Sequence, residues 1–190
     1  MVKNGFHHFL VTGERGRNSV PYFDPLLFAQ QLLTMEATCI DTTEFYGQDL
    51  QEHLTTITKE FPEPNFDNLF QFAFSLLPIC TSGSEFYEKA WLKLLSVRDE
   101  ERPCAVVSFE DFDGPRQQFA AHTVATLSML VMALKCAKDQ IPEDYQEVYH
   151  KRVYDYSSCI ADYQNETNYG FGGNVQATAM AVQVSHTPSR

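Results

Sequence analysis

The stretch that decides the fold is Arg116–Lys138, which reads RQQFAAHTVATLSMLVMALKCAK. It follows Gly114-Pro115 and contains the longest apolar run of the chain, so it predicts a helix of about 23 residues. Lys135 and Lys138 lie in its last turns, where the helix dipole favours cations. We therefore expect this helix to be the central element of the fold.

The segments on either side predict further helices. Asp24-Pro25 offers an N-cap followed by proline at the first helical position, for a helix that ends near Glu36. The sequence Asp41-Thr42-Thr43-Glu44 resembles a capping box, and a second helix would carry its apolar stripe from Tyr46 to Phe61. The other expected helices are a buried one over 66–77, one over 85–97 and one that runs from Pro142 to about Tyr163.

This pattern predicts a mainly α fold, a single-domain bundle of about six helices over residues 1–190 with a minor β element. An α+β fold is the alternative. The β signal is a buried strand over 104–109. Residues 1–20 are expected to form an N-terminal arm of strand and loop. Residues 169–190 are expected to form a C-terminal tail after a glycine-rich hinge, and within it 175–184 fits a helix or a strand equally well.

Negative charge is concentrated in the first half of the chain. Residues 18–88 hold eleven carboxylates and one base, Lys59, and the whole chain has a net charge of −11. Such a segment repels phosphate and attracts cationic surfaces. Several of these carboxylates stand where helices are expected to begin and are explained as caps. The clue to function that remains is an acidic face on the second helix, formed by Glu44, Asp49 and Glu52.

A second candidate surface is an aromatic stripe on the helix after Pro142. Its tyrosines recur at near-heptad spacing, and they are Tyr145, Tyr149, Tyr156 and Tyr163. Tyrosine joins apolar area to a polar hydroxyl, which suits a partly hydrated contact with a partner. The alternative is that the stripe packs on the protein's own core.

A motif at residues 106–114 has a different chemistry. It is an apolar strand that runs into Asp111-Phe112-Asp113-Gly114, and two carboxylates at this spacing can hold Mg²⁺ while one attacks phosphorus. Over about nine residues it resembles the first motif of the haloacid dehalogenase-like phosphatases. The resemblance implies that Asp111 is the nucleophile and Asp113 the acid/base. The alternative is that one of the two aspartates caps the long helix, with Gly114-Pro115 as its entry turn.

Other candidate sites are sparse. Arg15 and Arg17 lie in a glycine-containing loop and form a candidate anion-binding pair, or else a solvated surface loop. The histidines do not cluster and no Cys-x-x-Cys occurs, so we expect no metal site and no cofactor. Clustered Lys and Arg for phosphate contacts are missing, so we expect no direct nucleic-acid binding.

The five cysteines are odd in number and mostly lie in apolar runs, which is typical of buried, reduced thiols. No segment has the pattern of a signal peptide or a membrane span. We therefore expect a cytoplasmic protein, in a reducing and soluble compartment.

These observations favour a non-enzymatic interaction or assembly protein that uses the acidic helical surface and the aromatic helix. It would be a self-assembling subunit, and so a homo-oligomer, or an acidic adaptor or inhibitor of a protein with a basic surface. The alternative is an Mg²⁺-dependent phosphate-handling enzyme that uses Asp111 and Asp113.

Overall fold

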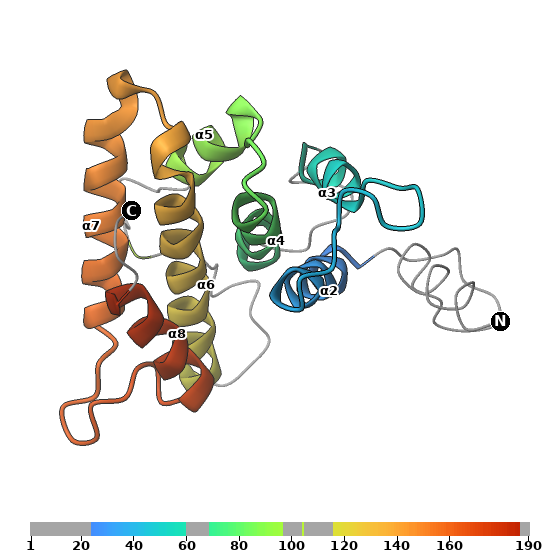
Figure 1. Ribbon diagram of the computed structural model, residues 1–190. Helices are drawn as coiled ribbons and strands as arrows, with labels where there is room; N and C mark the ends of the chain where they lie inside the picture. The colour runs from blue at the N-terminus through green and yellow to red at the C-terminus, as the bar shows by residue number, and fades with distance from the viewer. Residues whose placement is uncertain (1–23, 60–68, 97–103, 105–115, 187–190) are drawn as a thin grey trace, which may run out of the picture. The chain divides into compact units, whose positions relative to one another are not determined.

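Helices make up the secondary structure of the residues that the computed structural model describes, which are 24–59, 69–96, 104 and 116–186 (Figure 1). No strand occurs in these residues, and β pairing is limited to two isolated bridges, Phe45–Gln48 and Gln164–Phe171. The expected mainly α bundle is therefore confirmed. The predicted arm over 1–20 and residues 105–109 of the predicted strand lie outside the described residues, and Cys104 lies in a turn.

The chain divides into two compact units, Met1–Ser82 and Gly83–Arg190. The single domain that the sequence predicts over 1–190 stays a prediction.

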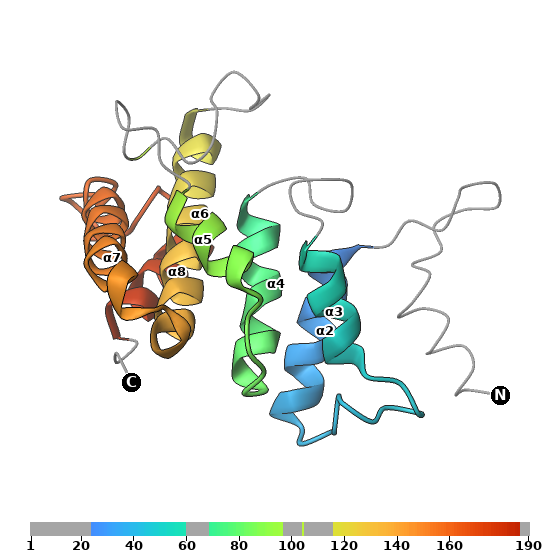
Figure 2. The ribbon, with the colours of Figure 1, turned by 90° about the horizontal axis from the view of Figure 1, so that it is seen from above.

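The first unit contains α2 (Pro25–Ala37), α3 (Leu50–Lys59) and α4 (Leu69–Thr81), and each of these helices contacts the other two (Figure 2). Asp24 caps α2 as expected, because its carboxylate accepts hydrogen bonds from the N–H groups of Leu26 and Leu27 at 3.0 and 3.1 Å. The apolar faces meet in a core whose fully buried side chains include Phe28, Leu32, Leu54, Phe72 and Leu76.

The buried helix expected over 66–77 is confirmed as α4, which continues past the expected end through Pro78 to Thr81. A proline lacks only one backbone N–H, and Pro78 with the neighbouring Ile79 is buried in the core. The free energy gained by burying this last turn outweighs the loss of the one hydrogen bond that proline removes. The sequence prediction ended the helix at proline because proline usually breaks helices, and burial cannot be seen in the local sequence.

In the second unit α6 (Arg116–Ala137) is the central helix, as expected. It contacts α5 (Glu88–Ser96), α7 (Gln146–Ala161) and α8 (Val175–His186), and α7 runs alongside it (Figure 1). Two short 3₁₀ turns, η1 (Lys138–Gln140) and η2 (Glu143–Tyr145), connect α6 to α7. The side chains of α6 that are fully buried include Val124, Leu127, Leu130, Val131 and Leu134.

The segment expected to be a C-terminal tail contains a docked helix. Asn174 caps α8 by accepting hydrogen bonds from the N–H groups of Gln176 and Ala177 at 2.8 and 3.1 Å. Ala177, Ala181 and Val184 of α8 are buried, and α8 packs on α6. The Lys135 ammonium of α6 donates to the Val184 carbonyl at 2.7 Å, near the negative end of α8.

Residues Gln118–Gln140 form a helix long and apolar enough to cross a membrane by length and composition, with a mean hydropathy of 1.5 in its most apolar window. This differs from the expectation that the chain holds no such segment. The core helix of a soluble protein passes the same test, and α6 packs against three helices of its own unit.

Gly172 gives a sharp test of how the segment before α8 packs on α6. Its φ of +60° lies in the left-handed region, and a Cβ added there would stand 2.9 Å from the Cα of Ala121. We expect Gly172→Ala to lower the free energy of unfolding by about 2–4 kcal/mol, measured by urea denaturation.

The matched control is Gly83→Ala, because Gly83 has a φ of +79° but no atom within 4 Å of an added Cβ. The Gly83→Ala variant should lose only the free energy needed to hold an alanine in a left-handed backbone conformation, about 1 kcal/mol. Equal losses for the two variants would show that residue 172 does not approach α6 as described.

Candidate functional site

The acidic segment around the start of α3 is the candidate site, and its local structure differs from the expectation. The predicted capping box at 41–44 is wrong, because α3 begins at Leu50 and its first turn is capped by Asp49. The Asp49 carboxylate accepts a hydrogen bond from the N–H of Glu52 at 2.8 Å. Asp41 instead accepts from the N–H and the hydroxyl of Thr43 at 2.8 and 2.7 Å, which forms an Asx turn.

A tight turn over 45–48 precedes α3. The backbones of Phe45 and Gln48 exchange two hydrogen bonds, at 2.9 and 3.1 Å, and the central residues Tyr46 and Gly47 have φ of +53° and +78°. Two left-handed residues at the centre are the signature of a type I′ turn. The prediction that Tyr46 belongs to the apolar stripe of α3 is therefore wrong, since its side chain is 56% exposed at the turn.

Four exposed carboxylates lie on this segment, and we call them the acidic turn: Asp41, Glu44, Asp49 and Glu52. The hydroxyl of Thr43, and then its N–H, hold the pKa of Asp41 below its ordinary value, so this carboxylate is ionised at neutral pH. Among the described residues, the carboxylates of Glu44 and Glu52 have no hydrogen-bond or ion-pair partner within the protein. The only base among the described residues of the first unit is Lys59.

An open pocket of about 380 Å³ lies beside the acidic turn. Its walls come from the turn and the first two turns of α3, and they are Gln48, Asp49, Leu50, Glu52, His53 and Thr56. The structure thus places Asp49 and Glu52, two of the three acids of the predicted helical face, at one pocket. Glu44 does not line the pocket and lies in the turn before α3 instead of on its face.

A partly buried polar network fixes the acidic turn to all three helices of the first unit. The carboxyl group of Glu36 in α2 accepts hydrogen bonds from the side-chain amide of Gln51 in α3 and from the hydroxyl of Thr81 in α4. The same Gln51 amide donates to the hydroxyl of Thr42 at 3.1 Å, and the Leu50 N–H donates to the Thr42 carbonyl at 2.9 Å. The network therefore holds both ends of the acidic turn.

The aromatic stripe of α7 requires a correction. Tyr149 and Tyr156 are 2% and 0% exposed, so these two rings belong to the core and present no surface to a partner. Burial, and then the charge of Asp139, raise the pKa of the Tyr149 hydroxyl. Tyr163 is partly buried. Tyr145 is 41% exposed, and the centroid of its ring lies 5.0 Å from that of the Trp91 ring. The alternative drawn from the sequence, in which the stripe packs on the protein's own core, describes these tyrosines better.

An exposed tyrosine of α7 was missed at the sequence level. Tyr154 is 73% exposed and lies on the outer face of α7 with Glu147, Lys151 and Ser158. A large aromatic residue that interrupts a polar stripe at helical spacing was the available signal.

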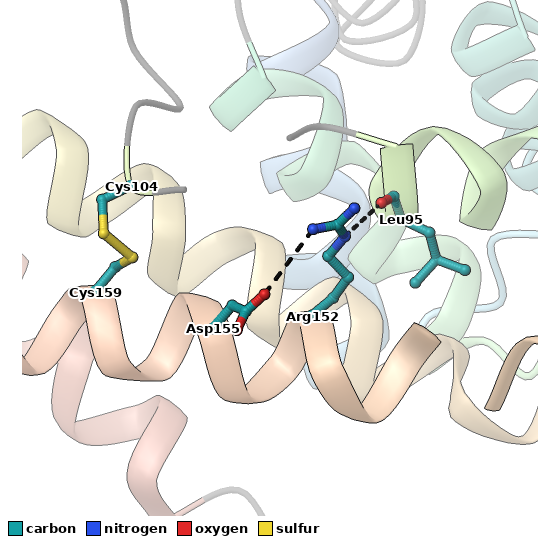
Figure 3. A network of polar contacts seen from close by, with 5 residues as sticks. All are labelled: Leu95, Cys104, Arg152, Asp155 and Cys159. Atoms are coloured by element: carbon teal, nitrogen blue, oxygen red, sulfur yellow. Dashed lines mark hydrogen bonds and ion pairs between the residues drawn. A yellow bond between two sulfur atoms is a disulfide. The ribbon is translucent and has the colours of Figure 1, made fainter. Parts of the chain in front are cut away.

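The prediction of buried, reduced cysteines is also wrong. Cys104 and Cys159 form a disulfide with 5.5 Å between their Cα atoms (Figure 3), and Cys80 and Cys136 are disulfide-bonded too. Cys39 is the free cysteine, and it is exposed. Apolar flanking residues predict burial but do not distinguish a thiol from a disulfide. The expectation of a reducing compartment rested on reduced thiols and loses that support.

The remaining candidates lie outside the described residues. They are Asp111 and Asp113, proposed for Mg²⁺ and phosphoryl chemistry, and Arg15 and Arg17, proposed for anion binding. The part of the chain that the structure describes contains no group of three or more His, Cys, Asp or Glu side chains placed to hold a metal ion.

No protein-family model matches the chain, and no curated protein is similar enough to it to count as a relative.

The polar network can be tested at Glu36. Replacing it by alanine leaves the amide of Gln51, which is 2% exposed, without its carboxyl partner, so we expect the free energy of unfolding to fall by about 2 kcal/mol. The measurement is urea denaturation of the full chain.

Glu44→Ala is the control, because it removes a carboxylate of the same turn that has no partner among the described residues. Its effect should stay within about 0.5 kcal/mol. If both variants lose the same stability, the Glu36 network does not hold the acidic turn.

Proposed function

We propose that the protein is a non-enzymatic binding protein that docks on a basic protein surface through its acidic turn. The observation that carries this proposal is the exposure of four carboxylates on one short segment, Asp41, Glu44, Asp49 and Glu52. Two of them, Asp49 and Glu52, line an open pocket. Like charges gathered on an exposed surface create a local negative potential that attracts cationic groups.

The carboxylates do not contribute equally. Asp49 uses one oxygen to cap α3, and the positive end of the helix dipole offsets part of its charge. Asp41 is engaged with Thr43, yet it remains ionised. Glu44 and Glu52 have no such role within the described residues, so their carboxylates supply most of the attraction for a partner.

Tyr46 adds an aromatic surface to this charge. Its side chain is 56% exposed, and the centroid of its ring lies 4.6 Å from the centroid of the Phe45 ring in an edge-on arrangement. Aromatic rings attract Lys and Arg side chains that approach their faces, so Tyr46 and the carboxylates favour the same kind of partner. A left-handed backbone at a tyrosine costs about 1–2 kcal/mol, which the turn tolerates while it keeps the ring exposed.

The pocket also has a rigid base. Leu50 and Leu54 are buried in the core of the first unit, and the Glu36 network holds Gln51 between them. A binding surface on a fixed backbone loses little conformational entropy when a partner docks.

The partner would be a second protein with clustered Lys and Arg or a second copy of this chain, and light scattering distinguishes the two. A self-assembling subunit gives an oligomer whose mass falls as salt rises, because exposed charge pairs are screened over about 8–10 Å at physiological ionic strength. An adaptor or inhibitor stays monomeric until a basic partner is added.

The test of the binding surface uses charge reversal at the two free carboxylates. We expect Glu44→Lys with Glu52→Lys to weaken binding of a Lys/Arg-rich peptide about tenfold or more, because attraction becomes repulsion at the contact. Binding is measured by fluorescence anisotropy of the labelled peptide at several salt concentrations.

The matched control reverses two exposed glutamates of the second unit, Glu143→Lys with Glu147→Lys, which gives the same net charge. Its affinity should stay within about threefold of the parent protein. Equal weakening in both variants would mean that the peptide senses only net charge, and the acidic turn would then not be the binding surface.

A further inference from the structure

Side chains on one face of α7 are attached to two positions elsewhere in the chain, and those two positions are close to each other in sequence. Arg152, Asp155 and Cys159 lie along this face (Figure 3). The guanidinium Nε of Arg152 donates to the Leu95 carbonyl at 2.8 Å, and Cys159 is bonded to Cys104, which is 55 residues earlier in the chain. Residues 95 and 104 are therefore both attached to α7.

The attachment at residue 95 is a charge-assisted hydrogen bond. Leu95 lies in the last turn of α5, where carbonyl groups have no partner inside the helix and the dipole favours a cation. Arg152 supplies both the donor and the charge. The ion pair between Arg152 and Asp155 spans 4.0 Å and is partly exposed, so it contributes little by comparison.

The attachment at residue 104 is covalent and is the stronger of the two. A disulfide that closes a loop of 55 residues removes many conformations from the unfolded chain and so favours the folded state. The Cys159 side of the bond is 4% exposed, which places that sulfur in the core of the second unit.

We propose that the Cys104–Cys159 disulfide is a clasp that sets the stability of the second unit, and that the functional protein is the oxidised form. Closing the clasp converts two thiols into one S–S bond, and two electrons and two protons pass to an oxidant such as glutathione disulfide or a disulfide oxidoreductase. Opening it takes two electrons and two protons from a dithiol reductant. The protein therefore matures where disulfides form and persist.

The bond itself is tested by peptide mapping of the full chain, purified without reductant after free thiols are blocked by an alkylating agent. The clasp predicts one cross-linked peptide pair that contains Cys104 and Cys159, and alkylation at Cys39. Alkylated Cys104 and Cys159 would overturn the proposal, and this readout requires no variant.

The effect on stability is tested by thermal unfolding. Cys104→Ser should lower the Tm of the oxidised protein by about 10 °C, and a dithiol reductant should lower the Tm of the parent protein by more than it lowers that of the variant. Glutathione disulfide should then restore the parent Tm. The control Cys39→Ser should match the parent in both conditions.

Equal Tm values for the oxidised parent and Cys104→Ser would overturn the proposal even if the cross-linked peptides are found. So would a reductant effect that is the same in the two proteins, because that effect would come from the other disulfide-bonded cysteines, Cys80 and Cys136.

Discussion

The second unit depends on the burial of α6. Leu127, Leu130 and Leu134 of this helix are fully buried, and each contributes about 2 kcal/mol relative to exposure. A helix that is apolar on most of its circumference needs neighbours on several sides, and α5, α7 and α8 supply them. This demand explains why Tyr149 and Tyr156 of α7 face inward. It also explains why the segment after the glycine-rich turn docks on α6, with Gly172 making the close approach possible.

The first unit satisfies a different constraint, because its three helices share a polar network as well as an apolar core. Glu36 receives hydrogen bonds from α3 and α4, and Gln51 extends the network to Thr42 in the turn before α3. Glu36 is thus an acidic residue that stabilises the fold. The exposed carboxylates of Glu44 and Glu52 are the ones that we propose meet a partner, and they form a much smaller surface than the charge of residues 18–88 suggests.

The sequence predicted those elements whose signal is local. The Asp24-Pro25 cap, the apolar run of α6 and the buried character of α4 each follow from residues within one or two turns. The predicted start of α3 was wrong because two acids, Asp41 and Asp49, both suit an N-cap. Only Asp49 precedes a segment that becomes helical. The disulfide and the docking of α8 depend on residues far apart in the chain, which no local pattern reports.

We propose that the acidic turn binds the partner, whereas the buried tyrosines of α7 pack in the core. Hydrogen exchange of the full chain, measured with and without a Lys/Arg-rich peptide, tests this division most directly. We predict slower exchange over residues 41–56 when the peptide is present and no change over 149–160. Protection over 149–160 without protection over 41–56 would contradict the account.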